Sequence, residues 1–140
     1  MGIEAAIHER WTLHRQLCNL LPASKLWTGE VPLEDTNGVA ITAPYAAIDA
    51  SDKIRVTRTS SQRITSGTLT LKVWAATLTE VQAVIDEAVA RFDRSDFPFS
   101  NGRVLDMRPG TASYGEEADN DDSPIWSGTI PFEYRLLEVR

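Results

Sequence analysis

The clearest helical pattern lies near the middle of the chain, where hydrophobic residues recur every three or four positions. The segment Thr77-Leu78-Thr79-Glu80 stands at the start of this pattern and fits a capping box. In a capping box the Thr77 hydroxyl accepts a hydrogen bond from the Glu80 amide, and the Glu80 carboxylate accepts one from the Thr77 amide. This spacing predicts an amphipathic helix over about residues 77–93. The residues of its apolar face are Leu78, Val81, Ile85, Ala88 and Phe92.

A second helical pattern begins near the start of the chain. Hydrophobic residues recur at helical spacing from Ile3 to Leu21, and the charged residues of this stretch lie off that stripe. Pro22 follows directly, and the residue before a proline is disfavoured in the α region. The sequence therefore predicts one amphipathic helix over about residues 3–21.

Two segments show the period of a strand that has one buried face. In residues 68–75 hydrophobic residues alternate with polar ones, and a longer alternation runs from Trp126 to Leu136. Pro131 interrupts the second segment and has no amide hydrogen to donate. It is therefore expected at a sheet edge, a bulge or a solvent-facing position.

Shorter β-like runs cover residues 45–50, 54–59 and about 103–108, with polar turn residues around 60–62 and 66–67. Long loops are expected over about residues 23–44, with one short strand at 26–28, and over about residues 110–124. Loops of such length are usually functional or interaction segments. Together the patterns predict one α+β domain over residues 1–140. Its antiparallel or mixed sheet of about four to six strands would be packed by the two helices.

The charges are segregated along the chain, whose formal net charge is −6. An acidic group lies in the second long loop, and a basic group lies in a stretch without any acid between Lys53 and Thr79. The acidic residues are Glu116, Glu117, Asp119, Asp121 and Asp122, and the basic residues are Lys53, Arg55, Arg58, Arg63 and Lys72.

Two interpretations of these charges are open. The basic side chains can simply occupy the wet face of strands, beside a solvated acidic loop. Alternatively, neighbouring copies dock head to tail, with the basic sheet edge against the acidic loop, and close a ring. The net charge and the lack of interleaved aromatic residues make general nucleic-acid binding a weak hypothesis.

Candidate catalytic residues are few. His8-Glu9 begins like a zinc-protease helix, but Thr12 stands where the second histidine belongs. His14 and Cys18 are four residues apart on one helical face, where they could pair a base with a thiol or hold a metal. A cysteine in a helix is more often a small buried hydrophobe. We therefore expect no catalytic residues.

Candidate cofactor sites are equally weak. Residues 119–123 resemble the start of a calcium loop, but Pro124 and Ile130 stand where its glycine and its bidentate glutamate belong. Neither a phosphate-binding loop nor a nucleophile elbow is present in the sequence. We expect no metal and no cofactor.

The cysteine content and the first residues indicate the compartment in which the chain is expected. Cys18 is the single cysteine, so no internal disulfide can form, and the chain suits a reducing environment. The first residues lack the basic start and apolar run of a signal peptide, and no stretch reaches the eighteen apolar residues needed to span a bilayer. The expectation is a soluble protein made in the cytoplasm, without a membrane partner.

Several short motifs follow one another along the chain in the order found in a known family. The helical start is followed by Leu26-Trp27-Thr28-Gly29, Val31-Pro32 and Pro44-Tyr45-Ala46-Ala47-Ile48. Leu69-Thr70-Leu71-Lys72-Val73-Trp74-Ala75 then leads into the capped helix, and the chain ends with the strand around Trp126-Ser127-Gly128-Thr129-Ile130-Pro131-Phe132-Glu133-Tyr134-Arg135. This order resembles the phage tail-completion or tail-terminator family, also described as head–tail joining proteins. The resemblance covers nearly the whole chain.

The resemblance implies a non-enzymatic virion protein that forms a ring, expected to be hexameric, at the head-proximal end of the tail. Such a ring ends tube growth and joins the tail to the neck. The implied partners are further copies of the chain, the tail tube protein and the neck or connector proteins, with a passing contact to genomic DNA in the lumen. The family has no catalytic residues to carry over. The acidic loop is longer than the family pattern requires.

Other functional classes remain open at this point. A small α+β regulatory or ligand-binding module would show a defined pocket and a stable dimer. Another neck or minor tail component would also be a structural protein. An enzyme that uses His14 and Cys18 would show thiol-dependent activity that Cys18→Ala abolishes.

Overall fold

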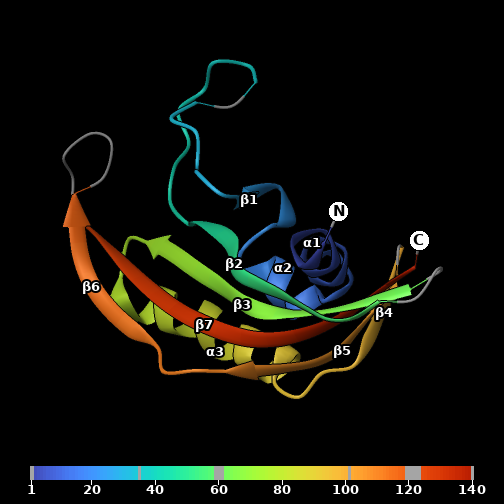
Figure 1. Ribbon diagram of the computed structural model, residues 1–140. Coiled ribbons are helices and arrows are strands. Elements are labelled where there is room, and N and C mark those ends of the chain that lie inside the picture. Colours follow the sequence, from blue (N-terminus) through green and yellow to red (C-terminus); the bar gives the residue numbers. More distant parts are fainter. Residues whose placement is uncertain (1, 35, 59–61, 101, 119–123, 140) are drawn as a thin grey trace.

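The computed structural model describes residues 2–34, 36–58, 62–100, 102–118 and 124–139 (Figure 1). These residues form a curled mixed sheet of seven strands in the order β1-β2-β3-β7-β5-β4, with β6 beside β7. β1 and β2 are parallel, and the other neighbours are antiparallel. The strands are β1 (Leu26–Thr28), β2 (Tyr45–Arg58), β3 (Gln62–Ala75), β4 (Phe97–Phe99), β5 (Gly102–Pro109), β6 (Ser113–Ala118) and β7 (Pro124–Val139). The predicted α+β class is confirmed.

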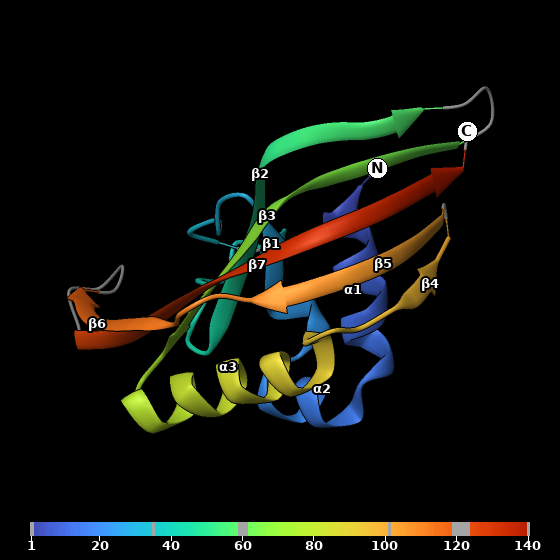
Figure 2. The ribbon, with the colours of Figure 1, turned by 60° about the horizontal axis from the view of Figure 1, so that its bottom comes forward.

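The helices lie on one face of this sheet (Figure 2). They are α1 (Ile3–Leu13), α2 (Arg15–Leu20) and α3 (Leu78–Phe92), and a short 3-10 turn, η1 (Ala23–Lys25), leads into β1. Every second residue in the second half of β3 and in the middle of β7, including Leu69, Leu71 and Phe132, is buried in the core beneath α1 and α3. The cavity left among these side chains measures about 10 Å³, about the minimum space that one water needs.

α3 confirms the strongest sequence prediction. The Thr77 side chain accepts a hydrogen bond from the Glu80 amide at 3.2 Å, as the first half of a capping box requires. Of the predicted apolar face, Val81, Ile85, Ala88 and Phe92 are buried, whereas Leu78 in the first turn is only partly buried. Val84, which was not predicted, is also buried. Burial of each larger side chain contributes about 1.5–3 kcal/mol before entropy is counted.

The predicted continuous helix over residues 3–21 is wrong. His14 adopts an extended conformation (φ −99°, ψ 108°) that separates α1 from α2. The break lets the chain turn, so that Trp11 of α1 and Leu17 of α2 are both fully buried, and the Trp11 Nε1 donates to the Leu21 carbonyl at 2.9 Å. Leu13 and Leu20 belong to the hydrophobic residues that recur from Ile3 to Leu21, but the turn leaves both exposed.

The strands are longer than the sequence indicated. The run at 45–50 and the described part of the run at 54–59 belong to one strand, β2, which ends at Arg58. Its pairing is irregular between Ser51 and Ile54 and between Arg55 and Thr57. Residues 66–67 lie inside β3 instead of forming a turn. β1 at residues 26–28 and β5 near 103–108 are confirmed, whereas β4 was not predicted.

The predicted loop over residues 110–124 is also wrong in its middle part. Ser113–Ala118 forms β6, which pairs with the first half of β7. β7 runs for 16 residues, and its second half pairs with β5 on the same side. The long β7 backbone therefore supplies the hydrogen-bond partners that this polar segment needs to become a strand.

Pro131 lies in the central strand β7, at a break between two partner strands. β5 ends opposite Phe132 and β6 begins opposite Thr129. The Pro131 carbonyl accepts from the Gly110 amide at 2.7 Å. The amide and the carbonyl of one strand residue point to the same side. The amide hydrogen that Pro131 lacks would therefore point into this break, so its absence costs no hydrogen bond of the sheet.

Candidate assembly surfaces

Four of the five basic residues found in the sequence lie at the opposite end of the sheet from the acidic residues. β3 and β7 pair along their whole length, from Gln62 opposite Val139 to Ala75 opposite Trp126. Lys53, Arg55, Arg58 and Arg63 belong to the β2–β3 hairpin at the first end, and the acidic residues to the β6–β7 hairpin at the second (Figure 1). We call these the basic hairpin (residues 51–66) and the acidic hairpin (residues 113–130). Lys72 lies further along β3, opposite Thr129, and so belongs to the acidic end.

Part of each group lies outside what the structure describes. Asp119, Asp121 and Asp122 fall in the connection between β6 and β7, outside the described residues. The backbones of Lys53, Arg55 and Arg58 belong to β2, but their side chains are outside the described part. Arg63, Glu116 and Glu117 are described with their side chains.

Arg63 is engaged within its own chain. Its Nε and Nη2 donate to Glu138 Oε1 at 3.3 and 3.2 Å. Arg63 has the same strand parity as Leu69, so it lies on the face that carries the helices and not on the wet face. Glu138 therefore offsets part of the basic hairpin's charge at this position.

Glu117 joins the acidic hairpin to the neighbouring strand β3. Its carboxylate accepts from Lys72 Nζ at 3.2 Å and from Trp74 Nε1 at 2.9 Å. The Lys72 ammonium lies 4.9 Å from the Trp74 ring centre, and Tyr45 lies beside that ring at 5.2 Å. These four side chains, on the face opposite the helices, form what we call the Trp74 cluster. Sequence reasoning missed it, although a tryptophan at a wet-face position of a strand was a signal.

The protonation of Glu117 depends on this cluster. Partial burial opposes its charge, but hydrogen bonds from Ser127, Lys72 and Trp74 and the charge of Lys72 outweigh burial and lower its pKa below the ordinary 4.5. A carboxyl whose pKa is lowered by folding stabilises the folded state above its unfolded pKa. This contribution is lost as the pH falls through the folded pKa.

We therefore expect the stability difference between the wild type and Glu117→Gln to be constant near neutral pH. It should shrink as the pH falls below about 4.5, the ordinary glutamate value. Urea unfolding from pH 7 to pH 3 measures this difference. Glu116→Gln removes the same charge from the adjacent exposed residue and should show little of this dependence. A pH-independent difference for Glu117→Gln would contradict the assignment.

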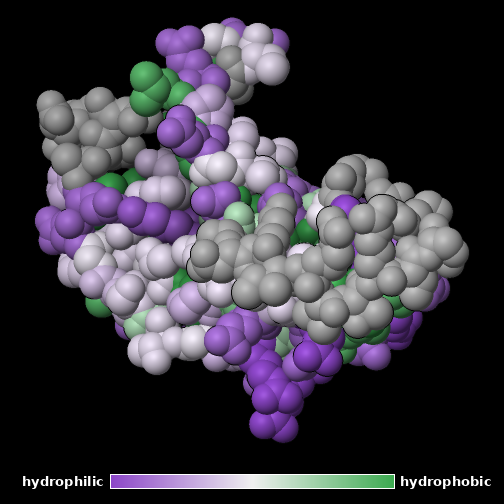
Figure 3. Space-filling view, viewed as in Figure 1, coloured by the Kyte–Doolittle hydropathy of each residue, from purple (hydrophilic) through white to green (hydrophobic). Residues whose placement is uncertain are grey.

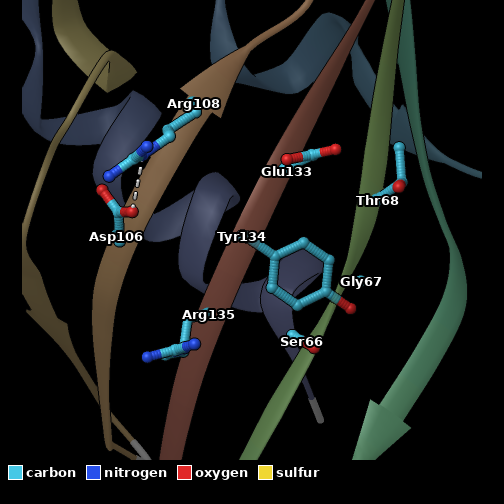
Figure 4. Close-up of a pocket in the computed structure, with 8 residues that line it drawn as sticks. All are labelled: Ser66, Gly67, Thr68, Asp106, Arg108, Glu133, Tyr134 and Arg135. Carbon is cyan, nitrogen blue, oxygen red and sulfur yellow. Dashed lines mark hydrogen bonds and ion pairs between the residues drawn. The ribbon is translucent and has the colours of Figure 1, made fainter.

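A shallow hollow of about 560 Å³ lies on the face opposite the helices (Figure 4). Its charged side chains come from β5 and β7 and include both signs, and Arg108 Nε donates to Asp106 Oδ2 at 3.0 Å. Burial, then the charges of Glu4 and Glu138, raises the pKa of Tyr134 to about 12, so this phenol stays protonated. The lining residues are Ser66, Gly67, Thr68, Asp106, Arg108, Glu133, Tyr134 and Arg135, among which there is neither a histidine nor a cysteine.

The structure does not join His14 and Cys18 into a catalytic pair. The Cys18 thiol donates to the Trp11 carbonyl at 3.2 Å, and His14 lies at the break between α1 and α2. Burial, then the charges of Arg10 and Arg91, lowers the pKa of His14. In the described part of the chain, no three metal-ligating side chains come together. None of its helices combines the length and apolar character needed to cross a bilayer.

Comparison with known proteins gives a likeness in fold. No protein-family model and no curated protein matches the sequence. Among solved structures, the chain is similar to one described as "Virion of native gene transfer agent (GTA) particle". The TM-score is 0.72 at 12% sequence identity, and the match covers 96% of this chain and 94% of the other. At this identity the match shows a shared fold.

Proposed function

We propose that this chain is a structural protein of a phage-like virion, in which several copies form a ring. The observation that carries the proposal is the fold similarity to a chain of the gene transfer agent virion, which extends over nearly the whole of both chains. Such coverage means that the two chains share their whole architecture rather than one common motif. A fold alone does not imply a function, so the proposal also relies on the surfaces of this chain.

The placement of the charges favours a ring. The acidic hairpin and the basic hairpin lie at opposite ends of one long sheet, so the acidic end of one copy can meet the basic end of the next. Such a contact joins two different surfaces and is heterologous. Heterologous contacts form rings when the rotation between copies closes.

Within a virion, we propose the role of tail terminator. The ring, six copies in our proposal, would sit at the head-proximal end of the tail, end tube growth and join the tail to the neck. Its partners would be the tail tube protein and the neck or connector proteins, with genomic DNA passing through the lumen. No catalytic step is part of this proposal.

Mass measurement of the purified protein tests the ring. We expect a species of about six times the 15.5 kDa chain mass in analytical ultracentrifugation, and rings in negative-stain images. The rival proposal, a small ligand-binding module, instead predicts a stable dimer that binds a small molecule. A two-fold symmetric dimer at every concentration would contradict the ring.

The charged contact makes a separate prediction. Neutralising Asp119, Asp121 and Asp122 together to Asn should weaken assembly by roughly tenfold at low salt, because three charges at one contact are lost. The effect should fade near 1 M salt, where the Debye length is about 3 Å. Sedimentation at several salt concentrations measures it.

A control variant removes the same charge from exposed positions elsewhere, by Asp49→Asn, Asp86→Asn and Glu133→Gln. We expect the control to assemble like the wild type. Equal weakening in both triple variants would show that net charge, and not the acidic hairpin, governs assembly.

A further inference from the structure

The described residues of 29–44, which are 29–34 and 36–44, form an arm that stands away from the body of the molecule (Figure 1). The Ile41 amide donates to the Leu33 carbonyl at 3.1 Å, and Glu34 and Ala40 form an isolated bridge. At the base of the arm, Lys25 Nζ donates to the Thr42 carbonyl at 2.8 Å. These bonds give the arm a defined hairpin-like shape.

The arm combines exposed hydrophobic side chains with acidic ones. Leu33 is 68% exposed and Val39 is 60% exposed, and Glu30 and Glu34 are exposed beside them. Figure 3 shows hydrophobic surface on this projecting segment. Large hydrophobic side chains held out from a protein body are typical of contact sites, because their burial against a partner is favourable.

The corner between α1 and α2 has the complementary character. Leu13 is 75% exposed and Leu20 is 38% exposed. Arg15 is exposed next to the break, and Arg10 and Arg91 lie close enough to His14 to act on its charge. Glu87 offsets Arg91 through an ion pair of 2.8 Å, which leaves the corner basic.

We infer that the arm of one copy docks on the α1–α2 corner of the next copy, Leu33 against Leu13 and Leu20, with Glu30 and Glu34 facing the basic side chains around Arg15. The inference rests on the proposed self-assembly and adds its second contact. The apolar parts match, and the charges are of opposite sign.

The placement of the two surfaces favours a contact between copies. Within one molecule the arm and the corner lie well apart (Figure 2). In Figure 1 the arm rises from β1 and the start of β2, between the acidic hairpin and α1, while the basic hairpin lies beyond α1 at the other end. Both contacts therefore run in the same head-to-tail direction around one ring.

Site-directed cross-linking tests the contact in the full chain. Leu33→Cys and Leu13→Cys are made separately in a Cys18→Ser background, which removes the native thiol. The two proteins are mixed and treated with a short bismaleimide. We expect a covalent heterodimer to dominate over the homodimers that each variant forms alone. A pair with Ala90→Cys, exposed on α3, in place of Leu13→Cys is the control.

A charge exchange provides the second measurement. Glu34→Arg and Arg15→Glu should each weaken self-association by roughly tenfold, because attraction becomes repulsion, and the two changes in one chain should restore it. The matched control exchanges Glu133 and Arg135, which are exposed on β7, and should leave association unchanged. Circular dichroism of each variant checks that the fold is kept.

The outcomes separate this inference from the proposed ring. If rings form but Leu33→Cys and Leu13→Cys do not cross-link, and the double exchange does not restore association, the arm contact is overturned. The proposed ring would still be supported. Cross-linked open chains without rings would support the arm contact and contradict the closed ring. A protein that stays monomeric and gives no cross-link would overturn the inference.

Discussion

Replacement of Trp11 with alanine is expected to lower the free energy of unfolding by about 3–5 kcal/mol, the usual cost of removing a large aromatic side chain from a core. Trp11 is fully buried and lies against the Phe92 ring of α3 at 6.4 Å between ring centres. Its Nε1 also donates to the Leu21 carbonyl at 2.9 Å. The substitution would leave a cavity and take away the donor that joins α1 to the end of α2.

Urea unfolding measures this loss, and Leu13→Ala on the same helix is the control. Leu13 is exposed, so its truncation should change stability by less than about 0.5 kcal/mol in dilute protein. Trp11→Phe should fall between the two, because it keeps a ring but leaves the Leu21 carbonyl without this donor. Equal stability of the Trp11→Ala and Leu13→Ala proteins would contradict the burial of Trp11 between α1, α2 and α3.

Gly128→Ala is expected to cost about 1–3 kcal/mol through overpacking. A β-carbon at this position of β7 would lie 2.5 Å from Ile85 Cδ1 and 2.6 Å from Val81 Cγ1, both on α3. The helix would have to move away from the sheet or its side chains would have to leave their rotamers. The loss should exceed the gain of about 0.4–1 kcal/mol that Gly→Ala brings by restricting the unfolded chain.

Gly115→Ala is the matched control, because a β-carbon there meets no atom within 4 Å. It should be neutral or slightly stabilising. Adding Ile85→Val to Gly128→Ala should recover part of the loss, since it removes the methyl group that lies nearest. Thermal unfolding of the single and double variants measures both effects. No rescue by Ile85→Val, together with an equal loss in Gly115→Ala, would contradict the close contact between Gly128 and α3.

The segments predicted best from sequence are those in which local pattern and burial agree. The spacing from Leu78 to Phe92, together with the Thr77 cap, is enough to specify α3 and its buried face. The alternation at Leu69, Leu71 and Val73 likewise identifies the buried face of β3. In both cases each residue's environment follows from the 3.6-residue or 2-residue period, so no knowledge of distant contacts is needed.

Where the sequence failed, distant parts of the chain decided the structure. At the break at His14, Trp11 lies against Phe92 of α3 and donates to the Leu21 carbonyl, and a helical period does not reveal these contacts. β6 forms because β7 extends beyond the end of β5. Helical spacing describes one segment at a time, whereas a sheet's hydrogen bonds join residues far apart in sequence.

The candidate surfaces divide in the same way. Composition shows that acidic and basic residues are segregated, that a long segment precedes β2, and that a catalytic pattern is missing from the sequence. Only the tertiary structure sets the charged hairpins at opposite ends of one sheet, pairs Arg63 with Glu138 and Glu117 with Lys72, and exposes Leu13 near basic side chains. Residue types determine which interactions are possible, but the packing of helices on the sheet decides which side chains meet and which face outward.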